Sequence, residues 1–109
     1  MLTIDQNPTD KRVFFRFDGK LDTNACQPLS EEIDRHLAGL QTEPTPGAAI
    51  DSEIIFDLQK VSFIASAFIR ICISCAKKIA KGKFSIVNCD PLTKKTFKIT
   101  GLDELLRVE

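Results

Sequence analysis

The feature that most constrains the fold is a short apolar run at residues 54–58, which reads Ile-Ile-Phe-Asp-Leu. A run of this length is typical of a central strand that is covered on both faces. The polar residues Asp57, Gln59 and Lys60 are expected to end it. We therefore expect this segment to lie in the middle of a sheet.

Other strand patterns flank this run. Residues 12–21 alternate apolar and polar side chains, with Phe14 out of step, and residues 2–4 and 84–87 are shorter strand candidates. Asp18-Gly19 indicates a turn or the end of a strand. The last apolar residues, Leu105, Leu106 and Val108, fit a short strand or a helical turn.

Amphipathic segments separate the predicted strands. In residues 24–40 apolar side chains recur every three or four residues, residues 22–24 offer candidate N-caps, and Pro28 is expected to lie in the first turn. Residues 66–81 predict a second helix, which Gly82 would end.

A third helix is predicted to begin at Asp90-Pro91, by the rule of an N-cap followed by proline, and to run toward Gly101. Helices that alternate with strands predict an α/β fold. A length of 109 residues predicts one domain, 1–109, in which residues 41–52 form an exposed loop.

The charge balance argues against nucleic acid as a partner. Fifteen lysines and arginines face fifteen aspartates and glutamates, so no global field attracts the chain to a phosphate backbone. No apolar run approaches the roughly 20 residues that span a bilayer, so no direct membrane insertion is expected. The first residues lack a secretory signal pattern, and we expect the protein to be cytoplasmic.

Cysteine and histidine usage predicts neither a metal nor a cofactor. Cys72-x-x-Cys75 resembles half of a zinc or redox site, but the second ligand pair at short spacing is missing. Both cysteines would share the apolar face of a helix, so we interpret them as reduced core residues. His36 is interpreted as a solvated helix residue.

Catalytic and nucleotide-binding motifs are also missing. The sequence contains neither a phosphate-binding glycine loop nor a nucleophile elbow. Aspartates could gather at strand ends, but caps and turns account for most of them. We expect a binding module rather than an enzyme, and an enzyme with a cysteine or aspartate nucleophile is the least favoured alternative.

Several motifs in order resemble the STAS family, the domain of bacterial anti-sigma factor antagonists and of sulphate transporter tails. Asp57-Leu58 and residues 61–64 (Val-Ser-Phe-Ile) match the family's D-L and V-x-F-I lead-in, and residues 19–22 match its G-x-L-D. Asn88 followed by residues 99–102 (Ile-Thr-Gly-Leu) resembles its ending. The resemblance covers about residues 13–108 and implies a mixed four- or five-stranded sheet with helices mainly on one side.

The family's phosphate-acceptor segment, D-S-[ST]-G, is altered in this chain. Ala65, Ser66, Ala67 and Phe68 stand at its four positions. Ser66 is the one hydroxyl left, and the resemblance makes it the candidate phosphorylation site, since the start of a helix favours a phosphate. The alternative interpretation is that Ser66 is an ordinary helix N-cap.

A helical wheel of the second helix suggests a partner surface. At 100° per residue, Ala67 and Ile71 fall beside the polar sector rather than with the apolar face. We predict that Ile71 is exposed within a polar rim and that this region contacts a partner. The predicted partner-binding residues are Ser66, Ala67, Phe68, Arg70, Ile71, Ser74 and Lys78.

The resemblance implies a function in bacterial regulation. It predicts a protein–protein interaction module similar to an anti-sigma factor antagonist, whose partner would be an anti-sigma factor or a related serine kinase. The alternative, from a different class, is a degenerate STAS subunit that serves as a structural or small-ligand-binding component of a transporter or signalling assembly. No catalytic residue, cofactor or metal site is predicted.

Overall fold

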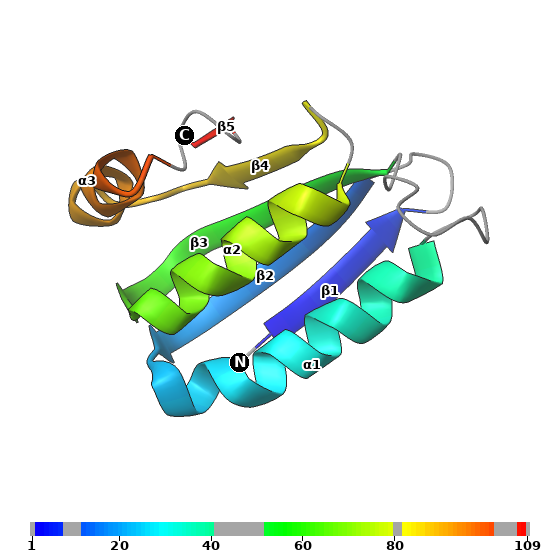
Figure 1. Cartoon of the computed structure of the whole chain (residues 1–109), viewed down its shortest axis with the longest axis horizontal. Helices are drawn as coiled ribbons and strands as arrows, with labels where there is room; N and C mark the ends of the chain where they lie inside the picture. Colours follow the sequence, from blue (N-terminus) through cyan, green and yellow to red (C-terminus); the bar gives the residue numbers. More distant parts are fainter. Residues whose placement is uncertain (1, 8–11, 41–51, 80–81, 102–106, 109) are drawn as a thin grey trace.

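The computed structural model describes residues 2–7, 12–40, 52–79, 82–101 and 107–108 (Figure 1). Strands and helices alternate after an initial strand pair, as the sequence predicts. Their bounds are β1 (Leu2–Asn7), β2 (Arg12–Leu21), α1 (Thr23–Leu40), β3 (Glu53–Ile64), α2 (Ser66–Lys78), β4 (Phe84–Val87), α3 (Pro91–Ile99) and β5 (Arg107–Val108).

The strands form one mixed sheet in the order β1-β2-β3-β4-β5. β1 pairs with β2 antiparallel, and the later neighbours pair parallel. Because each strand–helix–strand connection steps in the same direction, right-handed crossovers place the helices on one face of the sheet. α1 and α2 lie side by side across that face (Figure 1). The predicted α/β fold, mixed sheet and one-sided helices are confirmed.

The core lies between this face and the helices. Alternate residues of β2 and β3 point into it, and aromatic rings connect the layers. Phe56 of β3 packs against Phe17 of β2 at a ring-centre distance of 5.0 Å and against Phe84 of β4 at 4.8 Å. Phe68 of α2 reaches Phe17 at 5.2 Å, edge to face. This α2 side chain thus ties the helix layer to the sheet.

The sheet face without helices carries a polar network. Arg16 of β2 forms ion pairs with Asp5 of β1 and with Asp57 of β3. Asp57 Oδ1 also accepts hydrogen bonds from the Gln59 backbone N–H and from Asn88 Nδ2, each at 3.0 Å. The family-like residues Asp57 and Asn88 therefore join β3 to the end of β4, which is a structural role.

Two strand predictions are corrected. β3 does not end at Lys60 but continues to Ile64, because the second half of β2 pairs with it through Leu21. Asp18-Gly19 does not end β2. Instead Gly19, at φ 81°, stands at a shift of register between β2 and β3, where a positive φ suits glycine.

The helix boundaries are partly as predicted. Asp22 Oδ1 accepts from the Ala25 N–H at 2.8 Å and Asp90 Oδ1 from the Thr93 N–H at 2.6 Å, so both aspartates cap helices. The expectation for Pro28 is wrong, because it lies inside α1 beyond the first turn. α2 ends at Lys78, before Gly82, since the next residue leaves the helical backbone conformation.

His36 is also not the solvated residue that the sequence suggests. It is partly buried on α1, with its ring edge against Phe15 at a centre distance of 5.5 Å. The predicted loop at residues 41–52 lies outside the described residues except for Ser52, as do Leu105 and Leu106.

Candidate functional site

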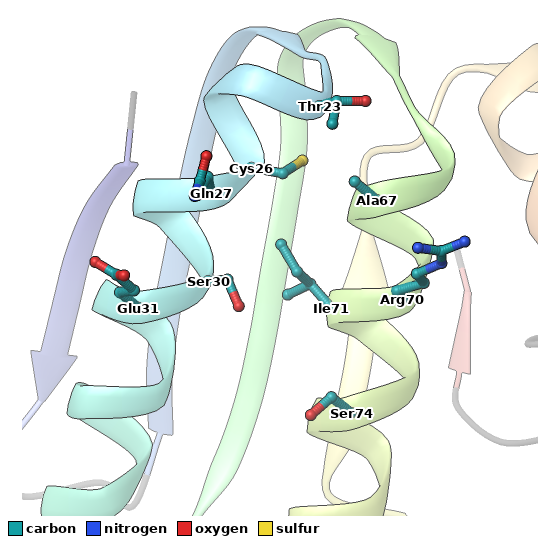
Figure 2. A pocket seen from close by; sticks show the side chains of 9 residues that line it. All are labelled: Thr23, Cys26, Gln27, Ser30, Glu31, Ala67, Arg70, Ile71 and Ser74. Carbon is teal, nitrogen blue, oxygen red and sulfur yellow. The ribbon is translucent and has the colours of Figure 1, made fainter.

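A groove runs between the N-terminal halves of α1 and α2, with a volume of about 470 Å³ (Figure 2). Both helices start at the same edge of the sheet, because β2 and β3 are parallel and each leads into the helix that follows it. The groove is lined by Thr23, Cys26, Gln27, Ser30 and Glu31 of α1 and by Ala67, Arg70, Ile71 and Ser74 of α2.

The groove combines an apolar floor with a polar rim. Figure 2 shows Cys26, Ala67 and Ile71 pointing into the space between the helices. Glu31 stands on the α1 flank and Arg70 on the α2 flank, so the two sides carry opposite charges. A partner segment of mixed polarity could be recognised here, with apolar contacts at the centre and charge at the edges.

The Cys26 thiol belongs to the floor rather than to any reactive site. Its side chain is buried, and Sγ donates a weak hydrogen bond to the Leu21 carbonyl at 3.6 Å. Burial and the neighbouring Asp22 carboxylate both raise the pKa of the Cys26 thiol above its ordinary value. The thiol is therefore protonated at neutral pH and acts as a small apolar group.

The N-terminus of α2 lies next to the groove and has no side-chain cap. Ala65 is the N-cap residue, with φ −94° and ψ 166°, and its N–H donates to the Leu21 carbonyl at 2.9 Å. Ser66 is the first helical residue and is exposed. The N-cap interpretation of Ser66 is thus wrong, and its hydroxyl stands at a helix end that favours negative charge.

Two of the predicted partner-binding residues are buried, and the helical wheel misplaced one of them, Ile71, whereas it placed Phe68 correctly on the apolar face. Phe68 is fully buried and Ile71 is only 8 % exposed, so neither presents a free side chain to a partner. The reason is that α1 packs along the side of α2 that the wheel leaves open, and Ile71 faces α1 across the groove floor. Sequence spacing within one helix cannot reveal which second helix covers it.

The other predicted residues lie along one edge of α2. Ala67, Arg70 and Ser74 line the groove, while Ser66 is exposed at its end. Lys78, one turn further along, pairs with Asp34 of α1 through Nζ and Oδ1 at 2.9 Å. This ion pair links the two helices, so Lys78 has a structural role.

The α1 wall was missed by the sequence analysis. About half of the lining comes from Thr23, Gln27, Ser30 and Glu31, yet no motif marked them as partner-binding residues. The available signal was the G-x-L-D match at residues 19–22, which leads directly into α1. Only the parallel pairing of β2 and β3 shows that this helix start meets that of α2.

The interpretation of Cys72 and Cys75 as core residues is confirmed. Both are buried, and within the described residues no cluster of potential metal ligands is found. Burial raises the pKa of the Cys75 thiol to about 12, against a smaller opposing effect of Lys78, and it also raises the pKa of Cys72 well above the ordinary value. These thiols are thus neutral and poor nucleophiles at physiological pH.

We predict that native and denatured protein differ sharply in thiol reactivity. All four cysteines are free. Because thiolates are the reacting species, Cys72 and Cys75 should react with a disulfide reagent at pH 8 at least about 100-fold more slowly in native than in denatured protein. In denatured protein all four cysteines should react, so the reagent should release four equivalents of its thiolate per chain. Stoichiometric zinc that protects two thiols would contradict this prediction.

The sequence matches the STAS domain family over residues 2–109. The chain belongs to the STAS family. Solved structures share its fold at low sequence identity. An anti-sigma factor antagonist from Mycobacterium paratuberculosis superposes with a TM-score of 0.78 at 22 % identity, covering 99 % of this chain and 83 % of that one.

Two structures of the anti-sigma factor antagonist SpoIIAA are also similar to this STAS domain. The unphosphorylated form gives a TM-score of 0.76 at 17 % identity, covering 100 % of this chain and 88 % of that one. The phosphorylated form, described as a Bacillus cell fate determinant, gives 0.68 at 20 % identity, covering 100 % and 91 %. A comparison of this chain with curated proteins found no significant match.

The described part of the STAS domain has no helix that is both long and apolar enough to cross a bilayer. Its groove is built from α1 and α2 without any charged side chain in the floor.

Proposed function

We propose that this STAS domain is a non-enzymatic, cytoplasmic regulatory module that binds an anti-sigma factor or a related serine kinase through the groove between α1 and α2. The observation that carries the proposal is the position of the groove beside the exposed, uncapped start of α2. The apolar floor would contribute affinity for a partner segment, and the charged flanks would fix the position in which that segment binds.

The proposed contact extends beyond the groove itself. Specific interfaces bury about 800 Å² on each partner, which is more than one groove of this size supplies. Glu31 and Arg70 stand on its two sides and extend the surface over the outer faces of both helices. A partner that carries a basic group toward α1 and an acidic group toward α2 would match this arrangement.

Ser66 is the proposed phosphorylation site, and the helix geometry supplies a mechanism. A phosphate on the first residue of α2 would meet unpaired backbone N–H groups and the positive end of the helix. Arg70 lies four residues later, on the same side of the helix, so it can pair with this phosphate. Phosphorylation would then remove the positive charge from one flank of the groove and weaken the binding of an acidic partner group.

One observation supports the second candidate function. Of the two positions at which the family carries hydroxyl groups, the one that faces the groove is Ala67, whereas Ser66 lies outside the groove lining. A STAS domain whose acceptor segment has no hydroxyl at its groove-facing position suits the alternative role as a constitutive subunit of a transporter or signalling assembly. The two functions differ in whether a kinase modifies the domain.

The test is phosphorylation by a purified anti-sigma factor with serine kinase activity from the same cells, followed by mass spectrometry. We expect one phosphate on Ser66 and less than about one tenth of that modification in Ser66→Ala, because a single hydroxyl is left in the acceptor segment. Ala67→Ser is the matched variant, since it places a hydroxyl at the groove-facing position of the acceptor segment. Modification of Ser62, Ser74 or Ser85 would contradict the assignment, and modification of Ala67→Ser alone would favour the second function.

A further inference from the structure

The outer side of α3 carries an exposed apolar pair. Leu92 and Ile99 are each 76 % exposed and are two of the three large apolar side chains that stand out from the described surface. Seven residues apart, they fall within about 20° of one another around the helix and about 10 Å apart along it. Thr93 and Phe97 anchor the opposite side of α3 in the core. Leu92 and Ile99 are therefore not needed for packing.

A row of lysines borders this apolar pair. Lys94, Lys95 and Lys98 are exposed on the same outer arc of α3, which contains no acidic residue. None of the three forms an ion pair with the described residues, whereas Arg12, Arg16 and Lys78 all do. Asp90, four residues before Lys94, is already engaged as the helix cap. In a chain with no net charge, α3 is thus a locally basic surface.

A hollow of about 440 Å³ lies beside the lysines, between α3 and β5. The three lysines, Pro91 and Val108 line it, so aliphatic stems and an apolar strand residue form its walls and ammonium groups its rim. The apolar pair, the three lysines and this concavity thus occur together at α3.

We propose that α3 and the adjoining hollow bind an acidic amphipathic helix of a partner protein. Leu92 and Ile99 are spaced as one side of a helix–helix seam, two turns apart, and a facing helix with carboxylates beside its apolar stripe would pair with the lysines. A flat anionic membrane could meet the lysines but could not fill the hollow, and two apolar side chains give little depth of insertion.

This surface is separate from the proposed α1/α2 site. α3 lies beyond β4, on the far side of the helix layer from α1 (Figure 1). Among the described residues the two sites share no lining residue, so each can be occupied while the other is bound. The domain would then join two proteins rather than respond to one.

The probe is a fluorescein-labelled three-heptad helical peptide with leucine at its seam positions and glutamate beside them. Its anisotropy is followed during titration with the full chain, and amide chemical shifts locate the contact. We expect saturable binding that shifts α3 and β5 resonances and weakens as salt rises toward about 0.5 M. The same peptide with lysine in place of glutamate should not bind.

Variants make the test specific. Leu92→Gln with Ile99→Gln should weaken binding at least about tenfold, as should Lys95→Glu with Lys98→Glu. Phe63→Gln and Lys77→Glu, which alter exposed residues elsewhere, should leave binding unchanged. Melting temperatures should stay within a few degrees of the wild-type value, because all these side chains are exposed.

Three outcomes would overturn the proposal. One is saturable binding of the acidic peptide with chemical-shift changes confined to α1 and α2. Another is equal binding of the acidic and basic peptides. The third is co-sedimentation of the chain with phosphatidylserine vesicles, lost in the same α3 variants, without peptide binding, which would identify a membrane surface instead.

Discussion

Phe68→Ala should lower the free energy of unfolding by about 3–5 kcal/mol, the usual cost of removing a fully buried phenyl ring. Phe68 is completely buried and contacts Phe17 and Phe56 at ring-centre distances of 5.2 and 6.2 Å. The variant would leave a cavity where α2 meets the sheet. Urea denaturation followed by circular dichroism measures the change.

A second substitution at the same position, Phe68→Gly, tests the residue type that the family carries there. Phe68 occupies the position of the family's glycine, so Phe68→Gly restores that glycine while adding roughly 1 kcal/mol of helix cost to the cavity. Phe63→Ala, at a side chain that is 50 % exposed, is the matched control and should change stability by less than about 1 kcal/mol. Equal stabilities of Phe68→Ala and wild type would show that the ring is not part of the core.

Ile71→Asp should destabilise the fold by at least about 3 kcal/mol, because it deletes a buried apolar side chain and puts a carboxylate in its place. Ile71 is only 8 % exposed, on the floor between α1 and α2. Burial favours the neutral acid, so the introduced group should have a raised pKa in the folded state. The loss of stability should therefore be smallest near pH 4, where only the deleted apolar side chain counts, and should grow as pH rises from the unfolded-state pKa of about 3.9 toward the raised folded-state pKa. The unfolding midpoint in urea measures the change.

Ile71→Val is the control for shape and should cost about 0.5–1.5 kcal/mol without added pH dependence. A fully stable Ile71→Asp that merely lost partner binding would restore the sequence-based prediction that this isoleucine is exposed. The result also guides binding studies. Variants that test the groove should alter its rim, at Arg70, Ser74 or Glu31, because changes at its floor report on stability as well.

Local patterns in the sequence predicted most of the elements. The alternation in β2, the apolar run of β3 and the Asp90-Pro91 start of α3 each identified an element, because period and capping act over a few residues. Their order predicted an α/β domain. The same patterns mistook Gly19 for the end of a strand, since a bulge is defined by the partner strand rather than by its own residues.

The candidate site was predicted only in part. The segment 65–68 and the polar edge of α2 came from the sequence, and Ser66, Arg70 and Ser74 lie beside or in the groove. The sequence did not predict the α1 wall of the groove, because no pattern within α1 distinguishes a groove-lining glutamine or serine from a solvated one. Nor did the sequence show that α3 keeps Leu92 and Ile99 outside the core.

The sequence by itself therefore determined where most helices and strands form, which of their faces are apolar, and that Cys72 and Cys75 pack as small apolar residues. The tertiary structure alone decided which apolar side chains are covered. Ile71 is buried and Leu92 exposed, although both are apolar residues at the border of a helix face, because α1 packs beside α2 whereas no described element packs over the outer side of α3. Burial is a property of pairs of elements, and a pattern within one element cannot contain it.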